Sequence, residues 1–293
     1  MPVVANLPPS SAKCRCSLQM NTPRFLAVAT LFLILASGPA ASPAVAGEKP
    51  AGPLRLAVFQ VDATPPLGSP VAYAPARKID DPRSARGIVL LGVGKPMVLC
   101  AVDWIGIGNS GQDVWKEHLA TAAGTTPDRV AVHALHQHDG PRCDFSAEEL
   151  LVAAGIGNQQ HDVVFARQTI KKVSEAIAAA IAKARPVTHL GVGQAKVKKV
   201  ASNRRLLGPD GKVKLFRMSS WKIEERIATR LKASSDREGY ELSPFHPEEA
   251  QRAPEGVIDP LVKLISFWDG QQPIACLSYY ACHPQSYFGK GDV

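Results

Sequence analysis

The 293-residue sequence lacks several features that would place it in a familiar class. It has six cysteines but no C-x-x-C pair, which excludes a zinc ribbon. It has no internal repeat and no extended low-complexity tract, and nothing in it indicates a disordered or fibrous protein. Hydrophobic residues make up 45% and charged residues 20%, so the composition is that of a globular protein. The length fits one large domain or two small ones.

The N-terminal leader contains three basic side chains and no acidic one over residues 1–46. Its apolar run is shorter than the roughly 20 residues that a membrane span needs, and a small-x-small site ends it at Ala46. We expect a signal peptide cut before Gly47, with Met20 as an alternative start. Residues 47–293 are then the exported part of the chain, without a transmembrane anchor. No cysteine follows the apolar run, so a lipoprotein anchor is not expected.

The charge of the chain is positive but moderate. The formal net charge is +8, and removal of the three leader cations lowers it to +5. That charge favours solubility and contact with an anionic surface. The most basic stretch, residues 193–214, has no aromatic side chains for base stacking, so no nucleic-acid partner is expected.

Apolar runs alternate with helical patterns along the chain. Strands are expected at 53–68, 128–135 and 187–201, hairpins at 85–108 and 259–284, and helices at 110–124 and 161–186. Ser110 is the expected N-cap of the first helix, and Val164 opens the apolar stripe of the second. The polar stretch 203–256 reads as a surface insertion. This order predicts an α/β fold, with mixed β-sheets flanked by helices.

Four cysteines lie outside the leader, at wide spacings. Export permits disulfides between them, but one sequence does not define the pairing. Cys100 and Cys276 fall in strand-like runs, and we expect them to be buried thiols.

Three of the eight histidines fall within six positions, in the stretch HALHQHDGP. If that stretch is extended, His136 and His138 point to one side and His133 to the other. Two imidazoles on one side of a strand end can bind one metal ion. An H-x-H pattern also suits surface histidines or a polar strand end. The pattern fits metallo-β-lactamases poorly, because the acid Asp139 comes one position too early and the next histidine is missing. It also fits amidohydrolase barrels poorly, because at least three predicted strands precede it, whereas those barrels carry the pattern after their first strand.

A second histidine also ends a strand. His283 follows the apolar run of the last predicted hairpin, and Pro284 prevents the strand from continuing. Two strands far apart in the sequence therefore each end in a histidine and a turn. This arrangement favours convergence of His136 and His283 on one ion.

Four segments of the sequence, in order, resemble motifs of neutral/alkaline non-lysosomal ceramidases. They are VFQVDATPPLG (58–68), HQHDGP (136–141), SNRR (202–205) and EGVIDPLVKLISFWDGQQPIACLSYYACHPQS (255–286). The resemblance covers roughly residues 54–293, with an insertion near 206–250. It implies a catalytic domain built of mixed sheets and helices around a zinc ion.

Residue by residue, the resemblance assigns roles to the histidines. It implies that His136 and His283 bind Zn²⁺, and that His138 acts beside them as a proton shuttle or hydrogen-bond donor to the oxyanion. Arg204 matches an arginine that faces the substrate. Asp139 stands where the family often has serine, and we expect it to hydrogen-bond a histidine of the site.

The implied reaction is hydrolysis of the N-acyl amide bond of ceramide-like lipids, giving a fatty acid and a sphingoid base. The enzyme is expected to be secreted or periplasmic and to meet its lipid at a membrane surface. The family's glutamate and tyrosine ligands and its serine would lie beyond Val293, so this chain is expected to be an inactive fragment. Two alternatives stay open: a metallohydrolase of the same fold for another amide or ester, and a non-enzymatic exported binding protein.

Overall fold

The computed structural model describes residues 52–217, 247–284 and 291–293. The expected signal peptide, 1–46, and the middle of the expected insertion lie outside these residues. The described residues all belong to one compact unit, Glu48–Val293. Among the described helices, none is both long and apolar enough to cross a membrane.

A five-stranded sheet forms the centre of this unit, in the order β5-β3-β2-β1-β7. Its strands are β1 (Arg55–Asp62), β2 (Ser84–Leu91), β3 (Met97–Val102), β5 (Val130–Ala134) and β7 (Arg185–Pro186). Neighbouring strands are antiparallel except β3 and β5, which run parallel. The expected first strand, the first hairpin and the strand before the histidines are thereby confirmed.

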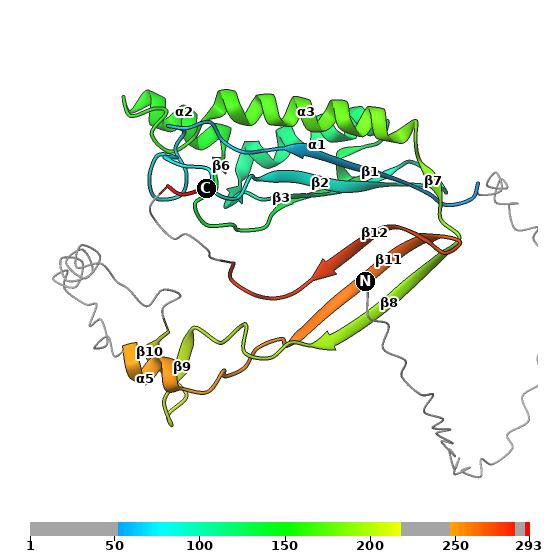
Figure 1. The fold of residues 1–293 in the computed structure, drawn as a ribbon. Helices are drawn as coiled ribbons and strands as arrows, with labels where there is room; N and C mark the ends of the chain where they lie inside the picture. The colour runs from blue at the N-terminus through cyan, green and yellow to red at the C-terminus, as the bar shows by residue number, and fades with distance from the viewer. Residues whose placement is uncertain (1–51, 218–246, 285–290) are drawn as a thin grey trace, which may run out of the picture. The chain divides into compact units, whose positions relative to one another are not determined.

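Helices α1 (Asn109–Ala123) and α3 (Val163–Ile181) cover one face of this sheet (Figure 1). The main apolar core lies between them and the sheet, and Trp104 and Trp115 meet edge to face in it with ring centroids 5.6 Å apart. The short helices α2 (Phe145–Ala153) and η1 (Pro127–Arg129) complete this layer.

Two expectations for the helices were wrong in detail. The N-cap of α1 is Gly108, and Ser110 lies inside the helix, where its hydroxyl accepts the backbone N–H of Ser146 at 2.7 Å. In α3, Val164 is 64% exposed, whereas its neighbour Phe165 packs in the core. The apolar stripe therefore starts one position later than the spacing suggested.

A three-stranded antiparallel sheet packs on the other face of the central sheet. It contains β8 (His189–Lys196), β11 (Leu261–Asp269) and β12 (Gln272–Tyr279), in the order β12-β11-β8. Leu56, Ile88 and Phe267 join the two sheets in a second apolar cluster. The turn between β11 and β12 contains Gly270 at a φ of 55°, as the expected hairpin requires. The predicted class, an α/β fold of mixed sheets flanked by helices, is confirmed.

The expected surface insertion is partly regular. Strands β9 (Arg205–Leu207) and β10 (Val213–Phe216) form a hairpin, and helix α5 (Pro247–Arg252) follows. The guanidinium of Arg217 ties these parts together by donating to the carbonyl oxygens of Ala250 at 2.8 Å and Ala253 at 2.7 Å. The two remaining strands, β4 (Gly106–Ile107) and β6 (Arg142–Cys143), form a short parallel pair.

The four cysteines of the described residues are free thiols. Cys100 is buried, as expected, and burial raises its pKa to about 12. The expectation for Cys276 was wrong, because it is exposed on β12, an outer strand of its sheet.

Candidate metal centre

The loop that carries His136 and His138 begins where β5 ends. Because β3 and β5 are parallel, their C-terminal ends meet at one edge of the sheet, where ligands of open α/β sheets usually bind. Backbone bonds join the two loops that leave these strands: Leu135 donates to Val102 at 2.9 Å, and Gln137 to Trp104 at 3.1 Å. The histidines are therefore held against the segment that follows β3.

The backbone of this loop is bent and not extended. His136 and Asp139 both have a φ of 58°, a region that residues other than glycine rarely adopt. A Cβ on Gly140 would lie 2.8 Å from the carbonyl oxygen of Gln137, so only glycine fits there. The expected strand alternation was thus the wrong reason for the convergence of His136 and His138, although the two side chains do meet.

Three imidazoles form one group, which we call the histidine group: His136, His138 and His283. Their potential ligand atoms lie within 4.8 Å of one another. The ring centroids of His138 and His283 are 4.5 Å apart, and those of His136 and His283 are 5.1 Å apart. His133 stays on β5, outside the group. The structure thus brings together residues that the sequence placed far apart.

Hydrogen bonds orient the rings of the group. Nδ1 of His136 lies 2.9 Å from the carbonyl oxygen of Ile105, which only accepts, so this Nδ1 carries the proton and Nε2 is left with its lone pair. Nδ1 of His138 lies 2.8 Å from the hydroxyl of Tyr73. On the other side of that ring, Nε2 of His138 faces Nε2 of His283.

The surroundings of His138 and His283 favour neutral imidazoles. Burial, together with the nearby His283, His136, Arg142 and Arg204, lowers the pKa of His138 to about 4. Burial, then His136 and Arg204, also lowers the pKa of His283. Uncharged imidazole is the form that binds metal ions.

This donor set fits zinc. Three neutral nitrogens with one open position is the arrangement of many catalytic zinc sites. Zn–N bonds of about 2.0–2.1 Å in tetrahedral geometry place the nitrogens roughly 3.3 Å apart, and the potential ligand atoms here lie within 4.8 Å of one another. The Nδ1 bonds to Ile105 and Tyr73 are of the kind that fixes ligating histidines in metalloproteins.

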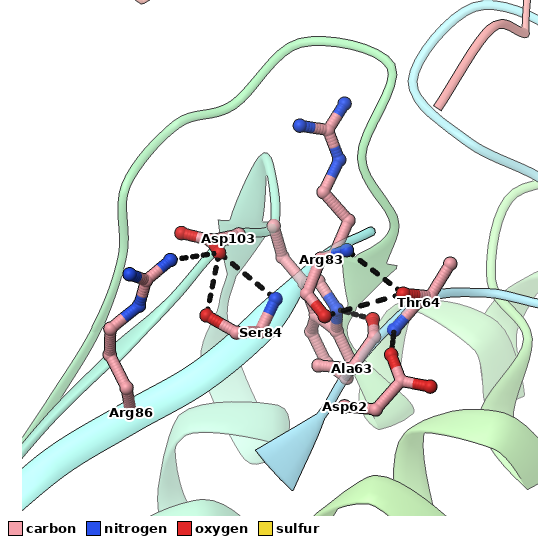
Figure 2. A network of polar contacts seen from close by, with 8 residues as sticks. Asp62, Ala63, Thr64, Arg83, Ser84, Arg86 and Asp103 are labelled. Atoms are coloured by element: carbon pink, nitrogen blue, oxygen red, sulfur yellow. Dashed lines mark hydrogen bonds and ion pairs between the residues drawn. The ribbon is translucent and has the colours of Figure 1, made fainter. Parts of the chain in front are cut away.

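A polar network joins the strand ends around Asp103 and Arg83 (Figure 2). Asp103, just after β3, accepts bonds from the N–H and hydroxyl of Ser84 at 2.9 and 2.8 Å and from Arg86 at 2.8 Å. The backbone N–H of Arg83 donates to the hydroxyl of Thr64 at 2.9 Å. These bonds hold the end of β3 and the start of β2 in register.

Two buried charges touch the histidine loop. Arg83, 6% exposed, directs its guanidinium to the carbonyl oxygen of His138 at 3.5 Å. Asp139 is fully buried, and its carboxylate accepts the N–H of Gly291 at 3.4 Å. Asp139 therefore contacts the chain segment that follows His283. Its expected bond to a histidine stays a prediction.

Arg204 lies at the same site as the histidines. A cavity of about 760 Å³ is lined by His136, His283, Arg204 and Cys282, among others. Sequence reasoning named these histidines and Arg204, which the structure brings together, but it named none of Tyr73, Ile105 and Gly291. Tyr73 lies in a loop with no recognisable pattern, and the other two act through their backbones, which no side-chain motif reports.

No family model matches this sequence, and no curated protein matches it. The solved structures that are similar to it include two ceramidases. For the neutral ceramidase from Pseudomonas aeruginosa the identity is 18% and the TM-score 0.49, over 80% of this chain and 34% of that chain. For a ceramidase complexed with C2 the identity is 20% and the TM-score 0.46, over 80% of this chain and 33% of that chain. The chain thus spans about a third of the length of each.

Proposed function

We propose that this chain belongs to a zinc-dependent hydrolase that cleaves the N-acyl amide bond of ceramide-like lipids. The observation that carries the proposal is the convergence of His136, His138 and His283, from two distant segments, beside a cavity that His136 and His283 line together with Arg204. The four motifs found in order along the sequence support the choice of reaction.

We assign the metal to the three imidazoles of the histidine group. Zinc held there would supply Lewis acidity and lower the pKa of water, both of which amide hydrolysis at neutral pH needs. Ile105 and Tyr73 hold the rings of His136 and His138 in orientation. The guanidinium of Arg204 would stabilise negative charge that develops on the carbonyl oxygen of the substrate.

The sequence resemblance and the geometry of the rings point to different roles for His138. The sequence resemblance implies proton transfer, whereas the ring geometry favours a third nitrogen ligand, because its Nε2 faces that of His283. Its low pKa, about 4, also suits a ligand better than a proton shuttle at neutral pH.

A second cavity supports an amphiphilic substrate. It has a volume of about 850 Å³, lies between the two sheets and shares Asp259 and Ala281 with the cavity at the histidines. Its apolar lining includes Val58, Leu99 and Leu277. Pockets of this size and lining are typical of small-molecule sites. An acyl chain would lie here with its amide near the histidine group.

We further propose that the enzyme is exported and acts on lipid at a membrane surface. The leader of residues 1–46 supports export, and the net charge of +5 that remains without it supports contact with an anionic surface.

The test is hydrolysis by the complete gene product, with and without a zinc chelator. Release of fatty acid from ceramide, lost on chelation and restored by zinc, is the expected result. Release from simple acyl amides or esters but not from ceramide would refute the substrate. Stoichiometric zinc without hydrolysis of any of these would refute the reaction, and no zinc at all would indicate a binding protein. Arg204→Gln should lower kcat by about 10²–10³.

A further inference from the structure

The loop between β1 and β2, residues 68–81, touches the segment that carries His136 and His138. We call it the strap loop. The hydroxyl of Tyr73 lies 2.8 Å from Nδ1 of His138, and the two rings are 5.5 Å apart at their centroids. The N–H of Ala72 donates to the carbonyl oxygen of Gly140 at 3.1 Å. The strap loop therefore contacts both a ring of the histidine group and the backbone beside it.

The strap loop also binds residues 291–293, in the same C-terminal stretch as His283. The N–H of Arg77 donates to Gly291 at 2.9 Å, and its guanidinium forms two bonds to Asp292, at 2.7 and 2.8 Å. Val293 is fully buried, and its N–H donates to Lys78 at 2.9 Å. One loop thus contacts both the segment of His136 and His138 and residues 291–293.

Gly291 makes this contact specific. Its φ is 76°, and a Cβ added there would lie 2.2 Å from the carbonyl oxygen of Pro75. The obstacle is backbone, which cannot rotate away. Gly291 also donates to Asp139, next to His138. Any side chain at 291 would push the C-terminal stretch away from the strap loop and from Asp139.

The strap loop is itself anchored to the body of the fold. The hydroxyl of Ser69 donates to the carboxylate of Asp162 at 2.5 Å. Asp162 is the N-cap of α3 and accepts the N–H of Phe165 at 2.9 Å. The strap loop is therefore fixed to the start of α3.

We propose that the strap loop positions the histidine group: Tyr73 is a positioning residue for His138, and residues 291–293 hold the strap loop and Asp139, next to His138, in place. This inference rests on the proposed metal site. It requires that the Tyr73 oxygen accepts a bond from Nδ1–H of His138, so that Nε2 keeps the lone pair a metal needs.

The first experiment measures the zinc affinity of the full chain by competition with a chromophoric chelator. Loss of a partner that orients a ligand typically costs 10–100-fold in metal affinity, so Tyr73→Phe should weaken zinc binding by about that factor. Tyr279→Phe, on exposed β12, is the matched control and should bind as the wild type does.

Gly291→Ala tests the second contact and should also weaken zinc binding about 10-fold or more. Its control is Gly211→Ala, because Gly211 has a similar φ of 75° with nothing within 4 Å of an added Cβ. Wild-type affinity in both Tyr73→Phe and Gly291→Ala would overturn the proposal. Equal losses of zinc affinity in Gly291→Ala and Gly211→Ala would overturn the role proposed for residues 291–293.

A second readout needs no metal. In ¹⁵N spectra of the histidine side chains of the zinc-free chain at pH 8, His138 should be mainly the Nδ1–H tautomer, and Tyr73→Phe should reduce that preference. A dominant Nε2–H tautomer in the wild type would refute the role of Tyr73. If the wild type binds no zinc but shows the expected tautomers, the proposed function fails and the role of Tyr73 survives.

Discussion

Replacement of His136 by alanine should abolish most of the stabilisation that zinc gives the chain. The wild type, at a free zinc concentration about 100 times its Kd, gains about 2.7 kcal/mol of unfolding free energy. His136 is one of the three proposed ligands and carries the bond to Ile105, so its loss should weaken binding at least as much as loss of an orienting partner, about 100-fold. At the same zinc concentration the variant then gains only about 0.4 kcal/mol.

Thermal unfolding with and without zinc measures this difference. For a domain of 150–250 residues, about 2.7 kcal/mol corresponds to a rise in Tm of roughly 5–11 °C, and about 0.4 kcal/mol to roughly 1–2 °C. His133→Ala is the control, because His133 is exposed on β5, outside the histidine group, and should keep the wild-type shift. A full shift in His136→Ala, or its loss in His133→Ala, would refute the assignment of ligands.

Three further predictions concern stability, each measured by urea unfolding. The pKa of His138 is about 4 in the fold, below its usual 6.5, so the unfolded chain takes up the proton first and the free energy of unfolding should fall as the pH drops from about 6.5 to 4. His138→Gln should flatten this pH dependence. An unchanged slope in the variant would contradict the lowered pKa of His138. Ile170→Ala, at a site 1% exposed, should cost about 2–5 kcal/mol, against less than about 0.5 kcal/mol for exposed Val164→Ala; equal costs would show that α3 packs differently. Gly87→Ala would bring a Cβ within 2.0 Å of the carbonyl oxygen of Leu99 and should cost about 1–3 kcal/mol or more, so an unchanged midpoint would disprove this close approach.

The secondary structure was largely predictable because apolar periodicity reports on burial. The hairpin over 259–284 and the helix over 161–186 carried strong periodic signals, and both are present. The apolar periodicity alone does not define the residue at which the buried face of a helix begins, as the exposed Val164 shows. Nor could it show that Cys276 lies on an outer strand, because that depends on strand order in space.

The site was predictable at the level of its histidines and not at the level of what holds them. His136 and His283 each follow an apolar strand, and a histidine at such a position is visible in the sequence. The bend at His136 is not visible, since a φ of 58° is unusual for histidine and is imposed by contacts with the segment after β3. Tyr73 was missed for the same reason, because its partner is 65 positions away.

The distance of 145 positions between His138 and His283 has a consequence during synthesis. At about 5–20 residues per second, the ribosome produces His283 roughly 7–30 seconds after His138. An ion that meets the nascent chain in that interval finds at most two of the three imidazoles, and a pair holds zinc far less firmly than a triad. At the proposed metal site, selection of the metal would thus wait until His283 has been synthesised and has joined His136 and His138.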